Sequence, residues 1–74
     1  MNKTQCKMAR AALGWRAQDL ADAANVHRIT VARFEAGDDI ADDSAKALQG
    51  ALEAQGVKFG RKAGRSSVSV PDGA

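Results

Sequence analysis

The apolar residues in the first three quarters of the chain recur at the three- and four-residue spacing of amphipathic helices. Four segments show this spacing, and they predict helices over residues 3–13, 17–24, 28–36 and 44–55. Asn2 and Gln5 have the spacing of a capping box at the start of the first helix. Gly14, Asn25 and Gly37 follow the first three segments, and each is a residue type that tolerates the left-handed conformation past a helix end.

The last helical segment and the residues after it give weaker patterns. Any residue from Asp42 to Ser44 suits the N-cap of the fourth helix, whereas Gly50 within that helix costs about 1 kcal/mol relative to alanine. Beyond Gly56, valine and phenylalanine alternate with polar residues, which predicts a short strand or hairpin. Disorder beyond Gly60 is the alternative. We therefore expect a helical domain over residues 1–56 and a C-terminal tail over residues 57–74.

Length and composition limit the classes of protein. A chain of 74 residues buries only about 60% of its unfolded surface, so its core must be compact. One cysteine and one histidine exclude an intramolecular disulfide and a four-ligand zinc site within one chain. The polar N-terminus and the lack of a long apolar run predict a soluble, cytoplasmic protein that makes no membrane contact. No cofactor, metal or small-molecule ligand is expected.

Charge is unevenly distributed, although the formal net charge is only +2. Residues 1–37 carry six basic and three acidic side chains, residues 38–56 one and five, and residues 57–74 four and one. The basic segments suit a polyanionic partner, whereas the acidic segment argues against indiscriminate binding of phosphate.

The second and third helical segments are separated by only two or three residues, which is the spacing of a helix-turn-helix. The stretch GWRAQDLADAANVHRITVARFEAG resembles the DNA-binding domain of the phage-repressor-like (Xre/Cro-like) helix-turn-helix family. The positions in register with the family pattern are Gly14, Leu20, Ala21, Val26, Thr30, Val31, Phe34, Glu35 and Gly37.

This resemblance extends to about residue 59, and it implies an all-α, lambda-repressor-like domain of four helices with a short β-prone tail. It also implies a sequence-specific regulator of transcription, a repressor, that binds double-stranded DNA. The chain departs from the family pattern at the start of each helix of the motif, with Arg16 and Ala17 for serine and glutamine, and His27 for serine. A third departure is the loop after the third helix, which is often basic in the family but reads GDDIADDS here. Its four aspartates should lower nonspecific affinity for DNA or turn away from the DNA.

The third helix has one contiguous stripe of residues opposite Val31 and Phe34. At 3.6 residues per turn the stripe comprises Arg28, Ile29, Ala32 and Arg33. Arginine can bond O6 and N7 of guanine, and isoleucine or alanine can meet a thymine methyl group, so we expect these four residues to contact bases. The alternative is an ordinary solvated helix surface.

Other residues are expected to support the stripe. The predicted phosphate contacts are the side chains of Arg16, His27 and Thr30 and the backbone N–H near Ala17. The family resemblance further implies an ion pair between Arg10 and Glu35 that fixes the third helix on the first. The alternative is two unpaired surface charges.

One recognition helix reads too few base pairs for useful specificity, so we expect a homodimer on a pseudo-palindromic operator. The fourth helix, or a strand at Val57–Phe59 or Val68–Val70, would form its interface. The rival hypothesis is a protein-interaction module, an antitoxin or anti-repressor, whose acidic loop binds a basic regulatory protein. An enzyme is not expected, because the single histidine lies in the motif and no catalytic constellation is evident.

Overall fold

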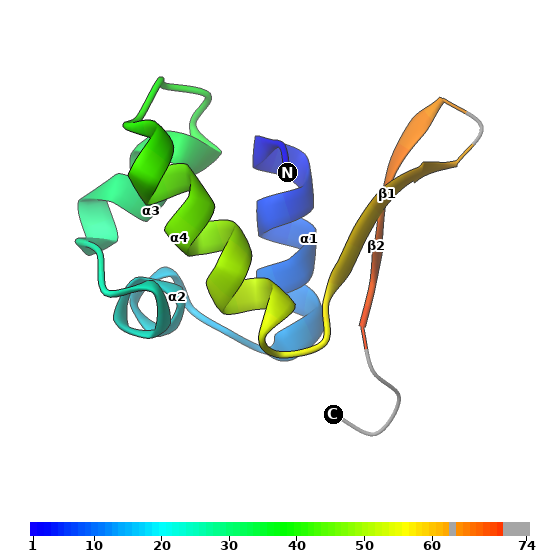
Figure 1. Ribbon diagram of the computed structural model, residues 1–74, viewed down its shortest axis with the longest axis horizontal. Coiled ribbons are helices and arrows are strands. Elements are labelled where there is room, and N and C mark those ends of the chain that lie inside the picture. The colour runs from blue at the N-terminus through cyan, green and yellow to red at the C-terminus, as the bar shows by residue number, and fades with distance from the viewer. Residues whose placement is uncertain (63, 71–74) are drawn as a thin grey trace.

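The computed structural model describes residues 1–62 and 64–70, and it contains four helices followed by a two-stranded hairpin. The helices are α1 (Lys3–Leu13), α2 (Ala17–Ala24), α3 (Arg28–Glu35) and α4 (Asp42–Glu53), and the strands are β1 (Lys58–Lys62) and β2 (Arg65–Ser69). Figure 1 shows α1 in the middle, with α2, α3 and α4 on one side and the hairpin on the other. The expected helical class with a β-forming C-terminus is confirmed.

Local capping explains where the helices begin and end. The Asn2 side chain accepts from the Gln5 N–H at 2.8 Å and the Gln5 side chain accepts from the Asn2 N–H at 2.9 Å, which is the predicted capping box. Gly14 and Asn25 have φ of 70° and 58°, the left-handed values predicted for them. Because these signals act within a few residues, the first two helices have the predicted bounds.

The third and fourth helices differ from their predicted bounds. α3 ends at Glu35, one residue earlier than predicted, because Ala36 serves as its C-cap. The prediction of an N-cap for α4 within residues 42–44 is wrong: Ala41 is the N-cap, and it makes no side-chain capping bond. Asp42 and Asp43 instead occupy the first turn, where the helix dipole favours negative charge. α4 ends at Glu53, two residues before the predicted end.

Small and branched apolar side chains from every helix form one core. Its members are at most 2% exposed, namely Cys6, Ala9, Leu20, Ala21, Val31, Leu48, Leu52 and Val57. Trp15 and Phe34 are half-buried and pack around this cluster. Among the described residues, no helix has the length and apolar character needed to cross a membrane.

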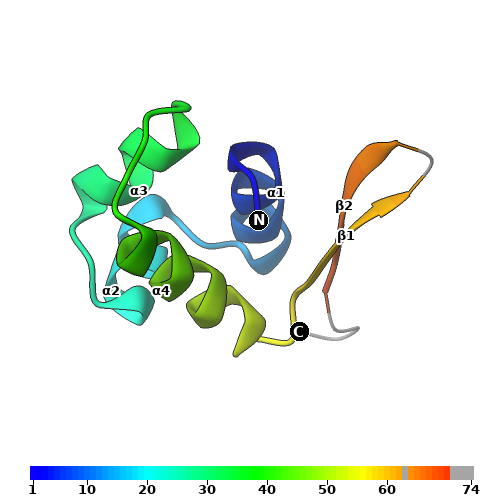
Figure 2. The ribbon, with the colours of Figure 1, turned by 45° about the horizontal axis from the view of Figure 1, so that its top comes forward.

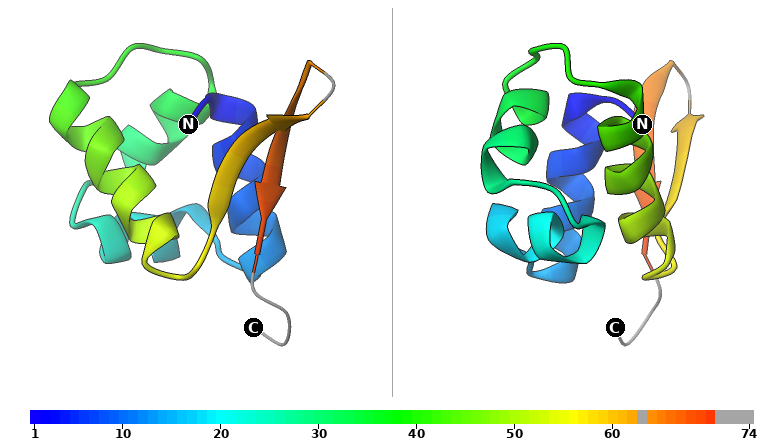
Figure 3. Two further views of the ribbon diagram at one scale, coloured as in Figure 1. Left: turned by 45° about the vertical axis from the view of Figure 1, so that its right-hand side comes forward. Right: turned by 60° about the vertical axis from the view of Figure 1, so that its left-hand side comes forward.

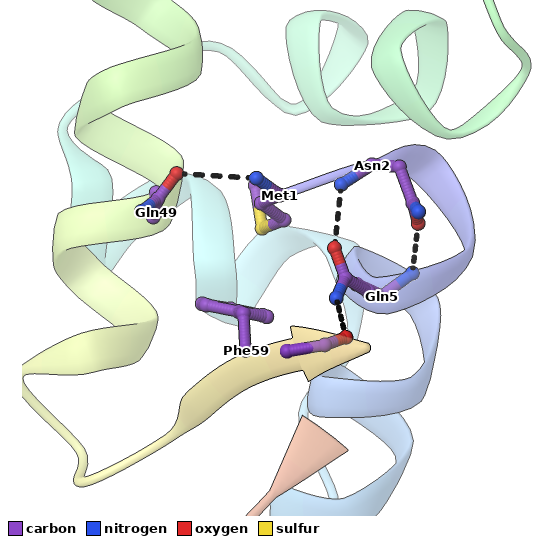
Figure 4. A pocket seen from close by; sticks show the side chains of 6 residues that line it. Met1, Asn2, Gln5, Gln49 and Phe59 are labelled. Atoms are coloured by element: carbon purple, nitrogen blue, oxygen red, sulfur yellow. Dashed lines mark hydrogen bonds between the residues drawn. The ribbon is translucent and has the colours of Figure 1, made fainter. Parts of the chain in front are cut away.

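The hairpin packs along α1, as Figure 3 shows. Its antiparallel register places Phe59 opposite Val68 and Gly60 opposite Ser67, and both Phe59 and Val68 pack against the core. The buried Gln5 amide donates to the carbonyl oxygens of Gly60 at 3.0 Å and Ser67 at 3.2 Å. Figure 4 shows this amide pointing towards β1. Of the two alternatives for the tail, a hairpin is therefore observed over the described residues. The alternative, disorder beyond Gly60, also covers residues 63 and 71–74, which lie outside the described part of the chain.

Candidate nucleic-acid interface

A three-residue turn, Asn25 to His27, connects α2 to α3. The left-handed Asn25 reverses the chain, and the Val26 N–H then donates to the Ala21 carbonyl oxygen at 3.0 Å. The Val26 side chain is half-buried against the core, and His27 is the extended N-cap of α3. This turn therefore fixes the direction in which α3 leaves α2.

The two faces of α3 differ as the sequence predicts. Val31 is fully buried and Glu35 is 7% exposed, whereas all four stripe residues, Arg28, Ile29, Ala32 and Arg33, are exposed. Ile29 is 64% exposed, the highest value for a large hydrophobic side chain among the described residues. Figure 2 shows α3 at the edge of the molecule away from the hairpin, so the stripe is accessible to a large partner.

An ion pair joins the inner face of α3 to α1. Arg10 Nε lies 2.7 Å from Glu35 Oε2, and Arg10 Nη2 lies 2.7 Å from Glu35 Oε1. Arg10 Nη1 also donates to the Trp15 carbonyl oxygen at 3.0 Å. The structure thus brings together the two residues implied by the family resemblance, in the bidentate geometry that makes arginine–carboxylate pairs strong.

The sulfur of Cys6 joins this ion pair, a role that the sequence did not predict. The buried Cys6 thiol donates to Glu35 Oε2 at 3.2 Å. Burial, followed by this hydrogen bond and the negative charge of Glu35, raises the pKa of the thiol to about 12. Burial alone would raise the pKa of Glu35, but the hydrogen bonds from Arg10 and Cys6 together lower it below its usual value. At neutral pH the pair is therefore charged and the thiol protonated.

The predicted phosphate contacts lie at the starts of α2 and α3. Arg16 is the exposed N-cap of α2, and its guanidinium Nη2 lies 3.2 Å from Asp19 Oδ1. The Asp19 carboxylate also accepts the Arg16 backbone N–H at 2.8 Å, whereas an arginine side chain has no acceptor to complete a capping box. These hydrogen bonds from Arg16 lower the pKa of Asp19. In the structure the Arg16 charge is therefore already paired, which the sequence did not reveal.

The remaining phosphate candidates keep accessible groups. Ala17 is the first residue of α2, where backbone N–H groups have no partner within the helix. His27 is exposed and makes no side-chain capping bond, and Thr30 is half-buried in the first turn of α3. These three residues lie beside the motif's two helix starts, where an anion is favoured.

The acidic segment is divided between two elements. Asp42 and Asp43 belong to α4, so of the four aspartates only Asp38 and Asp39 lie in the loop between α3 and α4. Asp38 Oδ2 lies 3.8 Å from Arg33 Nε, a contact that sequence reasoning missed because it depends on the turn after α3. A hollow among the N-terminus, α4 and β1, drawn in Figure 4, contains none of the predicted DNA-contact residues.

Comparisons with known proteins agree with this geometry. Residues 7–54, which are 48 of the 74 residues, match a family model described as helix-turn-helix. The matched span runs from within α1 through the end of α4, so it includes the turn, the stripe and the ion pair. The search of curated proteins found no match. The chain belongs to the Xre/Cro-like helix-turn-helix family of DNA-binding regulators.

Proposed function

We propose that this protein is a transcriptional repressor that binds a pseudo-palindromic operator as a homodimer and places α3 in the major groove. The observation that carries the proposal is the exposed stripe of Arg28, Ile29, Ala32 and Arg33 on a helix whose opposite face is fixed by the Arg10–Glu35 pair. Occupancy of the operator would exclude polymerase from an overlapping promoter.

The stripe has side chains of the types that read base edges. Each arginine can donate two hydrogen bonds to O6 and N7 of a guanine, and such a bidentate contact contributes about 1–3 kcal/mol of discrimination. Ile29 offers an apolar surface to a thymine methyl group, and the small Ala32 allows close approach of the helix. Because the ion pair holds α3 on α1, little ordering of the helix is needed on binding.

Phosphate contacts would fix the position of the helix on the duplex. We assign them to the side chains of Arg16, His27 and Thr30 and to the backbone N–H of Ala17. Arg16 must exchange Asp19 for a phosphate, and this exchange costs little because the side chains of the pair are 81% and 34% exposed.

The hairpin is the proposed dimer surface, since within the described residues each of its strands pairs with one other strand only, which leaves its second edge for a partner. The alternative surface, α4, has fewer features that favour a dimer interface. Its outward positions include Lys46, Gly50 and Glu53, and the only exposed large hydrophobic residues in the described parts of the chain are Met8 and Ile29. Main-chain pairing of strand edges does not require an apolar patch.

Selection from a random double-stranded DNA library at physiological salt tests the proposal. The native protein should enrich a palindromic motif, and Arg33→Ala should lose the preference at one base pair in each half-site. Lys46→Ala, which removes the same charge from α4, should keep the native motif. If the native protein enriches no motif, or if Arg33→Ala enriches the native motif unchanged, base reading by α3 is contradicted.

The exposed aspartates Asp38 and Asp39 favour a second candidate function, docking of a basic regulatory protein on a helix-turn-helix scaffold. The two candidates differ in their response to salt. A DNA-binding regulator loses affinity steeply as salt rises and prefers one duplex over random DNA, whereas a protein-interaction module shows neither property towards DNA.

A further inference from the structure

The turn after α3 places a carboxylate beside the stripe. Gly37 adopts φ of 94°, and the Asp38 N–H then donates to the Arg33 carbonyl oxygen at 3.0 Å. This hydrogen bond fixes the Asp38 backbone next to Arg33, one turn beyond it. As a result Asp38 Oδ2 lies 3.8 Å from Arg33 Nε.

The contact between the two side chains adds little to folding stability. Their side chains are 61% and 59% exposed, and solvent screens an ion pair that is exposed to this extent. An aspartate at this position also repels phosphate, which weakens binding to any DNA sequence. Folding stability therefore gives little reason for an aspartate at this position.

The atom of Arg33 that faces the carboxylate is informative. The Asp38 contact is made by Nε, so the two terminal nitrogens, Nη1 and Nη2, keep their N–H groups for a partner. Those N–H groups can donate two hydrogen bonds to O6 and N7 of a guanine. A carboxylate on the Nε side can therefore hold the guanidinium in place without competing for its terminal N–H groups.

We propose, on the basis of the proposed function, that Asp38 is a specificity-determining residue that positions Arg33 for guanine. In the operator complex Arg33 keeps its contact with Asp38 while its terminal N–H groups bind the base. On random DNA, Arg33 must leave Asp38 to reach a phosphate, and Asp38 repels that phosphate. Asp38 thus favours the specific complex over the nonspecific one.

The test compares native protein, Asp38→Asn and Asp39→Asn. Asp39 is the matched control, because it is the next residue, carries the same charge, and makes no ion pair within the described residues. Binding is measured against the selected duplex, the same duplex with the Arg33 guanine replaced in each half-site, and a random duplex of equal length. Arg33→Ala and the double variant, which combines Arg33→Ala with Asp38→Asn, complete a double-mutant cycle.

Asp38→Asn should reduce discrimination at the Arg33 base pair by about 2- to 5-fold, the upper value being the most that an exposed ion pair contributes. Its binding to random DNA should strengthen, with a log–log salt slope steeper by about 0.9, because Arg33 is free to contact a phosphate. Asp39→Asn should leave discrimination at the native value. In the Arg33→Ala background, Asp38→Asn should not change base preference.

Two results would overturn the inference. If Asp39→Asn reduces discrimination as much as Asp38→Asn does, the cause is general charge near the duplex. If Arg33→Ala relaxes the motif but Asp38→Asn does not, Arg33 reads guanine without help from Asp38. Both leave the proposed function standing, whereas a native protein that selects no motif contradicts the proposed function itself.

Discussion

At the scale of single residues, the carboxylate of Glu35 is the point where α1 and α3 are joined. It accepts two hydrogen bonds from Arg10 and one from the Cys6 thiol, and Glu35 as a whole is only 7% exposed. A partly buried charge is tolerated there because all of these donors converge on it. This side chain therefore helps to fix α3, and with it the exposed stripe, on α1.

Replacement of Glu35 by glutamine should lower the free energy of unfolding by about 1–3 kcal/mol, because Arg10 loses its counter-charge while it stays partly buried. Urea unfolding measures this change. Glu53→Gln, which removes an exposed carboxylate from α4, is the control and should change stability by less than about 0.5 kcal/mol. Equal stability of native protein and Glu35→Gln would contradict a structural role for the pair.

The lowered pKa of Glu35 also predicts a dependence of stability on acidity. The carboxylate takes up a proton near pH 4.5 in the unfolded chain and only at lower pH in the folded protein. Its stabilisation is therefore present above pH 4.5 and is lost as pH falls through the folded pKa. The free energy of unfolding of the native protein should therefore fall more steeply below pH 4.5 than that of Glu35→Gln.

Only some of the contacts of these residues could be predicted from the sequence. The Arg10–Glu35 pairing came from the family resemblance, because residues 25 positions apart meet only when two helices pack. The hydrogen bond of Cys6 to Glu35 depends on the rotation of α1 against α3, which helical spacing does not fix. The Arg33–Asp38 and Arg16–Asp19 contacts depend on side-chain directions at helix ends, which spacing alone does not fix.

At the scale of elements, helix ends were predictable where local chemistry sets them. The Asn2–Gln5 capping box, Gly14 and Asn25 act within a few residues, so α1 and α2 could be bounded from the sequence. The start of α4 could not, because Ala41 makes no capping bond. The docking of the hairpin on α1 was also not predictable, since it joins Gln5 to residues 55 and 62 positions away.

Gln5→Glu isolates the contribution of hairpin docking. The substituted carboxylate can still accept the Asn2 N–H, but it cannot donate to the carbonyl oxygens of Gly60 and Ser67. We expect a loss of about 1–3 kcal/mol at neutral pH, because a buried acceptor would face two other acceptors. Hydrogen exchange should show faster exchange in residues 58–69, and urea unfolding should show the loss.

Acid provides an internal check on Gln5→Glu. Protonation restores one O–H donor, so the difference from native protein should shrink as pH falls through the pKa of the new carboxyl group. Gln55→Glu, an exposed substitution of the same kind, should show neither effect. Unchanged hairpin exchange at neutral pH would mean that the Gln5 amide does not hold the hairpin.

At the scale of the whole molecule, α3 and the hairpin lie on opposite sides of α1 (Figure 1). This separation allows one side to bind DNA while the other forms a dimer interface. The hairpin is linked to the core through Val57, which is 2% exposed, and to α1 through Gln5. A dimer built on the hairpin would therefore hold the two α3 helices at a defined spacing.

Two variants distinguish the hairpin from α4 as the dimer surface. Truncation after Gly60 removes β2, and Gly50→Arg adds a large side chain on α4, where a Cβ would meet no atom within 4 Å. Sedimentation should find the truncated chain monomeric and Gly50→Arg dimeric, with circular dichroism as the check on folding. A truncated chain that remains dimeric, or a monomeric Gly50→Arg, would assign the interface to α4.

The exposed side of α3 is the proposed surface for contact with base pairs, and chemical-shift mapping can locate that surface. Labelled protein is titrated with the selected operator and with a random duplex of equal length. The side chains of Arg28, Ile29, Ala32 and Arg33 should shift strongly with the operator and weakly with random DNA, while the hairpin should respond alike to both. Operator-specific shifts that fall on the hairpin or on Asp38–Asp43, and not on α3, would contradict contact of α3 with base pairs.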